Sequence, residues 1–143
     1  MLSMVNSNDT QLSNANINVD DSFDIFQMRE INNGLNAGLD TSWYAFPFFD
    51  NFQMSEIRKG LESKIDVSKY ASSKYNSFEM KEIRRGLEMG IDLSNLGYNS
   101  FQMQVINDAG EVGIDMLQHV SPKVDYFSMK DLFKKLLKEK VMN

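Results

Sequence analysis

Apart from its carboxylates, this 143-residue chain has almost no side chains of the types that carry acid–base or metal chemistry. The chain has no cysteine, and His119 is its single histidine. Catalytic bases and transition-metal sites usually draw on clusters of histidine, cysteine and carboxylate side chains. A lone histidine in a turn is more typical of packing or solvent exposure. We therefore predict no catalytic residue, no metal site and no cofactor, and we expect that the protein is not an enzyme.

Four aspartates recur at equivalent places and form the nearest approach to a row of carboxylates. They are Asp40, Asp66, Asp92 and Asp115. An aspartate at the start of a short helical turn accepts a hydrogen bond from a backbone N–H, and this capping role explains all four without a metal ion. The chain carries neither a repeated Ser/His/Asp arrangement nor a glycine-rich phosphate loop.

The aspartates belong to a sequence repeat that organises most of the chain. The motif Phe-(Gln/Glu)-Met begins at Phe26, Phe52, Phe78 and Phe101, and a degenerate copy begins at Phe127. Successive copies start 26, 26, 23 and 26 residues apart. Periods of this size are typical of stacked supersecondary units. We predict an all-α fold, an array of about five helix-plus-short-turn repeat units that form one compact domain.

The stretch Tyr75–Gly97 shows how one repeat unit should fold. Asn76 and Glu79 are spaced as a capping box at the start of a helix. The apolar residues after the cap recur at helical spacing. They are Met80, Ile83 and Leu87. Gly90 supplies the left-handed residue that ends a helix, and Asp92 is placed to cap a second, shorter helical turn.

Two positions inside the repeat unit predict how it packs. Gly86 lies in the middle of the helix, where glycine costs about 1 kcal/mol relative to alanine, so we expect a neighbouring backbone to approach it closely. Gly34 and Gly60 hold the same position in the two preceding units. Phe78 lies opposite the apolar stripe on a helical wheel, which predicts neighbours on both sides of the helix unless the ring folds over the helix end.

Departures from the repeat mark its boundaries. The third linker is three residues shorter than the others, and Gly110 and Gly113 should shorten or distort the fourth helix. Pro122 forces a stop before a longer, lysine-rich capping helix with a polar outer face. The chain should therefore consist of a flexible or irregular N-terminal arm at 1–21, four helical repeat units at 22–122, and a degenerate fifth unit at 123–143.

Two units of the chain resemble a short helical repeat with the pattern QM-x-EI-R-x-GL-E-x-G-(I/L)-D-V-S-x-YA. They have the sequences NFQMSEIRKGLESKIDVSKYA and SFEMKEIRRGLEMGIDLS. The repeat is associated with uncharacterised proteins of Firmicutes, bacteria related to clostridia and streptococci, often in their phages and conjugative elements. The resemblance covers about Phe23–Val120. It implies an architecture and a phage or mobile-element setting, and it carries no catalytic motif.

The clearest surface departure from the repeat is the aromatic stretch Ser42–Phe49. Three of its residues, Trp43, Phe46 and Phe48, stand where the next unit has polar side chains. Those are Lys69, Ser72 and Lys74. Exposed aromatic residues are typical anchors of protein interfaces, so we predict that these three bind a partner. The alternatives are that they pack under the N-terminal arm, or that they join two copies in a homo-oligomer.

Basic residues on the second and third repeat units define another candidate surface. They are Arg58, Lys59, Lys81, Arg84 and Arg85. One hypothesis is a contact for nucleic-acid phosphates or for an acidic partner. The other is a solvated face paired with Glu62 and Glu88 on the same helices. The lysine-rich terminal helix favours the first hypothesis, whereas the net charge of −5 argues against non-specific nucleic-acid binding.

Our leading prediction is a non-enzymatic protein-binding module. The chain has no apolar run long enough to span a membrane and no signal-peptide pattern, and the lack of cysteine suits a reducing cytoplasm. The setting implied by the resemblance makes a host defence complex, a restriction or CRISPR nuclease, the expected target of an inhibitor of this kind. The alternative is a nucleic-acid-binding accessory protein that uses the basic residues and the C-terminal helix.

Overall fold

The computed structural model describes residues 22–142, so the predicted N-terminal arm at 1–21 lies outside the described residues. Contacts divide the chain into an N-terminal part that ends at Lys59 and a C-terminal part that begins at Gly60. All regular structure within residues 22–142 is helical, which confirms the all-α prediction. None of these helices is long and apolar enough to cross a membrane. The grouping into four repeat units and a terminal fifth stays a prediction.

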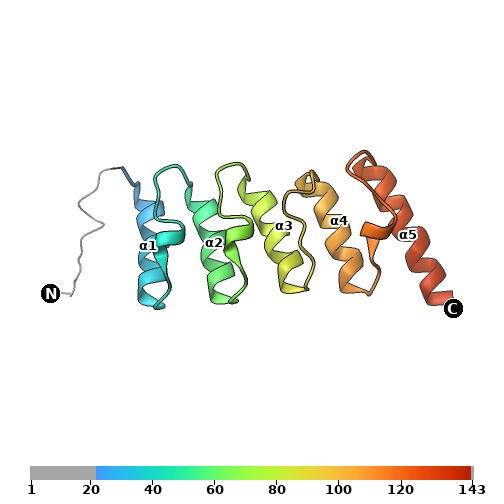
Figure 1. Cartoon of the computed structure of the whole chain (residues 1–143), viewed down its shortest axis with the longest axis horizontal. Helices are drawn as coiled ribbons and strands as arrows, with labels where there is room; N and C mark the ends of the chain where they lie inside the picture. The colour runs from blue at the N-terminus through green and yellow to red at the C-terminus, as the bar shows by residue number, and fades with distance from the viewer. Residues whose placement is uncertain (1–21, 143) are drawn as a thin grey trace. The chain divides into compact units, whose positions relative to one another are not determined.

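The N-terminal part consists of two α-helices joined by a 3-10 helix and a linker (Figure 1). These elements are α1 (Ile25–Asn36), η2 (Thr41–Trp43) and α2 (Asn51–Glu62), whose last residues belong to the C-terminal part. The linker at 44–50 brings the chain from η2 to the start of α2. Its core includes the buried side chains Ile31, Tyr44, Phe49 and Met54.

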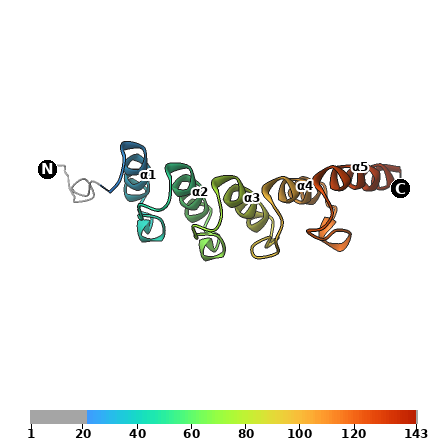
Figure 2. The ribbon, with the colours of Figure 1, turned by 90° about the horizontal axis from the view of Figure 1, so that it is seen from above.

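The C-terminal part continues the same alternation of helix and turn. Its elements are η3 (Val67–Lys69), α3 (Ser77–Glu88), α4 (Ser100–Glu111), η4 (Met116–Gln118) and α5 (Tyr126–Met142). Helix α3 packs on α4 and α4 packs on α5, and the three helices run in the same direction, so their amino-terminal ends follow one edge (Figure 1). Figure 2 shows these helices in one row and the turn segments in a second layer beside it.

Capping boxes start the helices, as the sequence predicts. In α3, the Asn76 side chain accepts a hydrogen bond from the Glu79 amide at 2.8 Å, and the Glu79 carboxylate accepts one from the Asn76 amide at 2.9 Å. The same reciprocal pair starts α1, α2 and α4. Each pair satisfies backbone N–H groups that have no partner inside the helix.

The four repeated aspartates also serve as caps. Each accepts from the amide two residues further along the chain. A 3-10 helix follows Asp40, Asp66 and Asp115, but only a turn follows Asp92. The predicted second helical turn is therefore wrong for the third repeat unit, where the linker is the shortest and the chain reaches the next cap, Asn99, sooner.

A left-handed residue follows each of the first four α-helices. These residues are Gly38, Lys64, Gly90 and Gly113, with φ between 62° and 84°. The expectation that Gly110 and Gly113 shorten or distort α4 is wrong, because α4 has 12 residues, as α1, α2 and α3 have. Gly113 supplies the terminating conformation (φ 81°) and Gly110 stays inside the helix.

Lys64 is the one non-glycine residue in this set, and we expect Lys64→Gly to stabilise the protein. Its φ of 62° crowds Cβ against the backbone, so glycine should raise the free energy of unfolding by roughly 0.5–1 kcal/mol. Urea denaturation followed by circular dichroism measures the change. The control is Lys59→Gly inside α2, which should lower stability by about 1 kcal/mol. A loss of stability in Lys64→Gly would contradict the argument.

The glycines in the middle of the helices all have close neighbours, but of two kinds. A Cβ on Gly86 would lie 2.7 Å from a backbone carbonyl oxygen of the following turn, as predicted. On Gly34 it would lie 2.0 Å from the Tyr44 hydroxyl, and on Gly60 it would lie 2.1 Å from the Tyr70 hydroxyl. The prediction of a neighbouring backbone is therefore wrong at Gly34 and Gly60, where a buried tyrosine side chain fills the space.

Candidate functional site

Trp43, Phe46 and Phe48 lie in and just after η2 and are exposed. Their exposed fractions are 40%, 41% and 60%. The rings of Phe46 and Phe48 stack with centroids 5.1 Å apart, and their centroids lie 6.3 and 4.7 Å from that of Phe49. Because Phe49 is buried, it ties the two outer rings to the core. We refer to Trp43, Phe46 and Phe48 as the aromatic patch.

Gln27 of α1 holds the backbone beneath this patch. Its side-chain amide donates to the Pro47 carbonyl at 3.2 Å and to the Phe49 carbonyl at 2.7 Å. Gln102 of α4 binds the linker after it in the same way, with a donation to the Pro122 carbonyl at 3.0 Å. Sequence analysis missed this contact. The signal for it is a glutamine, which can donate, at the third helical position together with a proline in the following linker.

The backbone of this linker does not require aromatic side chains. The equivalent linker in the C-terminal part carries Lys69, Ser72 and Lys74, yet it forms the same backbone hydrogen bonds. The Phe46 amide donates to the carbonyl two residues before it at 2.7 Å, and the Ser72 amide does the same at 2.7 Å. The backbone of this segment therefore does not depend on the three aromatic side chains, although the Phe46 and Phe48 rings contact the buried Phe49 ring.

Two of the five basic candidates lie in the N-terminal part, and both contact carboxylates. Arg58 pairs with Glu30 at 2.9 Å, across from α2 to α1. The Lys59 ammonium lies 3.7 Å from Glu56, one turn away on the same helix. These contacts favour the hypothesis of a paired, solvated face for this pair of residues.

The other three candidates lie on α3. Lys81 is exposed, and Arg84 pairs with Glu88 at 3.0 Å, as their spacing predicts. The Arg85 guanidinium forms ion pairs with several acidic side chains. Only Lys81 is therefore without an ion pair to a carboxylate among these three in the described part of the chain.

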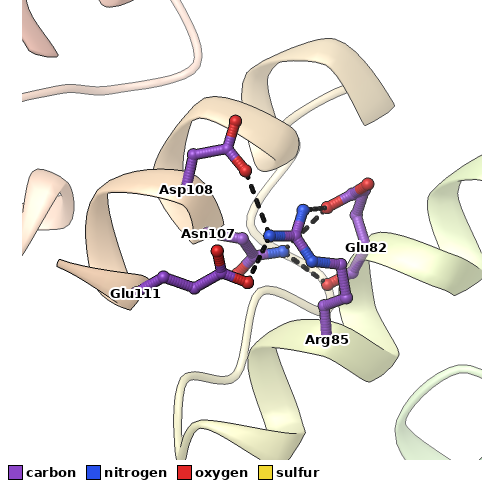
Figure 3. A network of polar contacts seen from close by, with 5 residues as sticks. All are labelled: Glu82, Arg85, Asn107, Asp108 and Glu111. Carbon is purple, nitrogen blue, oxygen red and sulfur yellow. Dashed lines mark hydrogen bonds and ion pairs between the residues drawn. The ribbon is translucent and has the colours of Figure 1, made fainter.

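Arg85 belongs to a polar network that joins α3 to α4 (Figure 3). Its guanidinium donates to Glu82 at 2.8 Å, to Asp108 at 3.0 Å and to Glu111 at 2.8 Å. Burial lowers the pKa of Arg85, but the hydrogen bonds to Glu111 and Asp108 and the charge of Glu82 outweigh it and raise the pKa above its ordinary value. Arg85 is therefore a permanently charged link between the two helices.

Asn107 completes this network. Its side-chain amide donates to the Glu82 carbonyl at 2.8 Å and to the Glu82 carboxylate at 3.0 Å. Its Oδ1 atom is buried without a hydrogen-bond partner in the described part of the chain. A Cβ on Gly86 would lie 3.2 Å from that atom, so the glycine leaves room for the amide. Every member of the network connects α3 to α4, and we assign it a structural role.

The phenylalanine that begins each repeat motif is exposed. In the C-terminal part, Phe78, Phe101 and Phe127 have exposed fractions of 71%, 61% and 73%. Phe26 and Phe52 of the N-terminal part are exposed as well. The expectation that Phe78 packs against a neighbour on its own side of the helix is therefore wrong, because its ring is exposed, whereas Met80 and Ile83 of the same helix are buried. Sequence analysis found the signal, a ring opposite the apolar stripe, and assigned it to packing.

Ring contacts connect two of these phenylalanines. The Tyr126 ring centroid lies 5.5 Å from that of Phe101 and 5.2 Å from that of Phe127. The Lys130 ammonium lies over the Tyr126 ring, 5.1 Å from its centroid. Aromatic surface thus continues from α4 to α5. We refer to Phe78, Phe101, Tyr126 and Phe127 as the phenylalanine edge.

An open hollow of about 350 Å³ lies beside the first turns of α3 and α4. Lys74, Tyr75 and Glu79 line it before and within α3, and Asn95 and Tyr98 line it from the short third linker. The Tyr75 hydroxyl accepts a hydrogen bond from the Asn95 amide at 2.9 Å. Glu79 of α3 holds the position that Gln27 has in α1, but as a carboxylate it cannot donate to linker carbonyls. The third linker therefore lacks the side-chain hydrogen bonds by which Gln27 holds the linker after α1.

His119 is exposed at the end of η4, whereas Tyr44 and Tyr70 are buried at the equivalent positions. Within residues 22–142 there is no group of three or more histidine, cysteine or acidic side chains that could hold a metal ion. Comparisons of the chain with known protein families, with curated proteins and with solved structures find no match. Function is therefore inferred from the contacts and exposure of the chain's own residues.

Proposed function

We propose that the protein is a non-enzymatic module that binds a protein partner through the aromatic patch. One observation supports this above the others. Trp43, Phe46 and Phe48 are exposed. The equivalent segment of the C-terminal part has lysine and serine at these positions and forms the same backbone hydrogen bonds. Aromatic side chains held in an ordered loop offer large contact areas at a low entropy cost, which is why they dominate binding energies at interfaces.

The net charge of the N-terminal part indicates what kind of partner surface would complement it. Residues 22–59 carry five acidic and three basic side chains, so a partner with a basic rim around an apolar pocket would complement them. Nucleases neutralise the phosphates of nucleic acid with lysine and arginine side chains, so they supply the basic part of such a surface. Together with the phage and mobile-element setting implied by the resemblance, this makes a restriction or CRISPR nuclease of the host our proposed partner, with the protein acting inside the bacterial cell.

The test replaces the patch with the residues of the equivalent linker, as Trp43→Lys/Phe46→Ser/Phe48→Lys. Because that linker has the same backbone hydrogen bonds, we expect the variant to fold like the wild type by circular dichroism. Purified candidate nuclease complexes should bind the wild type at least about 30-fold more tightly than the variant. A difference in affinity of this size corresponds to the loss of one or two anchor residues. Surface plasmon resonance measures the affinities.

Phe52→Ala is the matched control, since it removes an exposed ring of the same part outside the patch and should leave the affinity unchanged. A folded triple variant that binds the partner as tightly as the wild type would show that the patch is not the interface. Sedimentation of the protein alone tests the alternative of a homo-oligomer: a wild type that self-associates beside a monomeric triple variant would assign the patch to self-association instead.

A further inference from the structure

We propose that the phenylalanine edge of the C-terminal part binds single-stranded nucleic acid. Phe78, Phe101 and Phe127 are each the second residue of their helix, and the amino-terminal ends of α3, α4 and α5 follow one edge (Figure 1). Exposed aromatic rings spaced along an edge are the platforms on which unpaired bases stack. The edge shares no residue with the aromatic patch, which belongs to the N-terminal part.

Lysines flank the first and the last phenylalanine of the edge at the same spacing. One lies four residues before the ring and one lies three residues after it. They are Lys74 and Lys81 around Phe78, and Lys123 and Lys130 around Phe127. None of these four ammonium groups is ion-paired with a carboxylate within residues 22–142. Lys74 donates to the Asn95 side-chain oxygen, and Lys130 lies over the Tyr126 ring. A phosphate that binds these four lysines therefore has no ion pair with a carboxylate to break in the described part of the chain.

The acidic residues of the same segments are already used as helix caps. Glu79 accepts from the Asn76 amide at 2.9 Å, and Asp125 accepts from the Ser128 amide at 2.8 Å. The hydrogen bonds from Ser128 lower the pKa of Asp125. Segments 74–81 and 123–130 thus hold four lysines and two carboxylates, and the exposed Asp131 follows the second segment. The positive ends of three helix dipoles add to the positive charge along the edge.

Rings and cations are interleaved along the edge, which is the composition that single strands require. Phe101 and Phe127 are joined through Tyr126, over which Lys130 lies. The hollow beside the first turns of α3 and α4 offers space for a base next to the Lys74 ammonium and the Tyr75 hydroxyl. A DNA duplex keeps its bases stacked inside, so this edge should prefer a single strand.

Fluorescence anisotropy with a labelled oligo(dT) of about 20 nucleotides tests the proposal. We expect binding at low salt, and a slope near −3 when log K is plotted against log salt, because each of four phosphate contacts contributes about −0.7 on a single strand. Phe101→Ala should raise the Kd about fivefold or more through the loss of base stacking. Lys81→Gln/Lys123→Gln should reduce the slope to about half.

Two controls separate this edge from general charge and from the aromatic patch. The double variant Lys138→Gln/Lys140→Gln removes two positive charges, as Lys81→Gln/Lys123→Gln does, but from exposed positions of α5 outside the edge. Phe101→Ala should raise the Kd by the same factor in this double variant as in the wild type. The variant Trp43→Lys/Phe46→Ser/Phe48→Lys should bind the oligonucleotide at least as well as the wild type, so the two proposals can fail separately.

Three results would overturn the proposal. They are no anisotropy change at low salt, equal affinity for Phe101→Ala and the wild type, and equal affinity for the single strand and a duplex of the same length. Polyglutamate is the competing probe. If it displaces the oligonucleotide and itself binds with the same dependence on Phe101, the edge is a site for an acidic polypeptide and the assignment to nucleic acid is wrong.

Discussion

Gly34→Ala should lower the free energy of unfolding by about 2–3 kcal/mol, although alanine favours a helix over glycine by about 1 kcal/mol. The added Cβ would lie 2.0 Å from the Tyr44 hydroxyl oxygen and 2.8 Å from the Thr41 Cγ2 atom. The Tyr44 ring is fully buried and its hydroxyl donates to the Glu30 carbonyl at 2.7 Å. Moving the ring therefore breaks this bond and disturbs the core. Urea denaturation measures the loss.

The fourth repeat unit supplies a natural control for this prediction. Ala109 holds the position of Gly34 there and is buried, while the tyrosine position holds the exposed His119. No ring competes for the space, so Ala109→Gly should destabilise α4 by about 1 kcal/mol through helix propensity. In the N-terminal part, adding Tyr44→Phe to Gly34→Ala should recover part of the loss, because the nearest atom is removed. A stabilised Gly34→Ala would contradict the close contact.

Arg85→Ala should destabilise the C-terminal part by about 3 kcal/mol, because it leaves a buried carboxylate without its cation. The side chain of Glu82 is 8% exposed, whereas those of Asp108 and Glu111 are 46% and 58% exposed. Water can solvate the two exposed partners after the change, so most of the loss should come from Glu82. Amide hydrogen exchange of α3 and α4, together with urea denaturation, measures the effect.

Two further variants locate the origin of that loss. Lys59→Ala removes an exposed ammonium at 3.7 Å from its partner and should cost less than about 0.5 kcal/mol. Adding Glu82→Gln to Arg85→Ala should restore part of the stability, because a neutral amide is cheaper to bury than an unpaired charge. If Arg85→Ala costs no more than Lys59→Ala, the network does not hold α3 to α4.

The sequence by itself determined the α-helices and the residues at which they begin. Capping residues such as Asn76 and Glu79, terminating residues such as Gly90, and the pair between Arg84 and Glu88 all act within four residues along the chain. Local hydrogen bonds and backbone preferences of this range do not depend on the rest of the molecule, so a spacing in the sequence is enough to predict them. The all-α fold class follows from the same local hydrogen bonds and backbone preferences.

Only the tertiary structure decided what the repeated side chains contact and which of them are exposed. Arg85 reaches carboxylates up to 26 residues away, and Gln27 reaches a carbonyl 22 residues away, so neither contact follows from the spacing of residues within one helix. The same holds for Gly34, whose neighbour is a tyrosine ring and not a backbone. The phenylalanine of each repeat could pack or face solvent on sequence grounds alone. Its exposure depends on which helix face the neighbouring elements cover, and that is a property of the assembled chain.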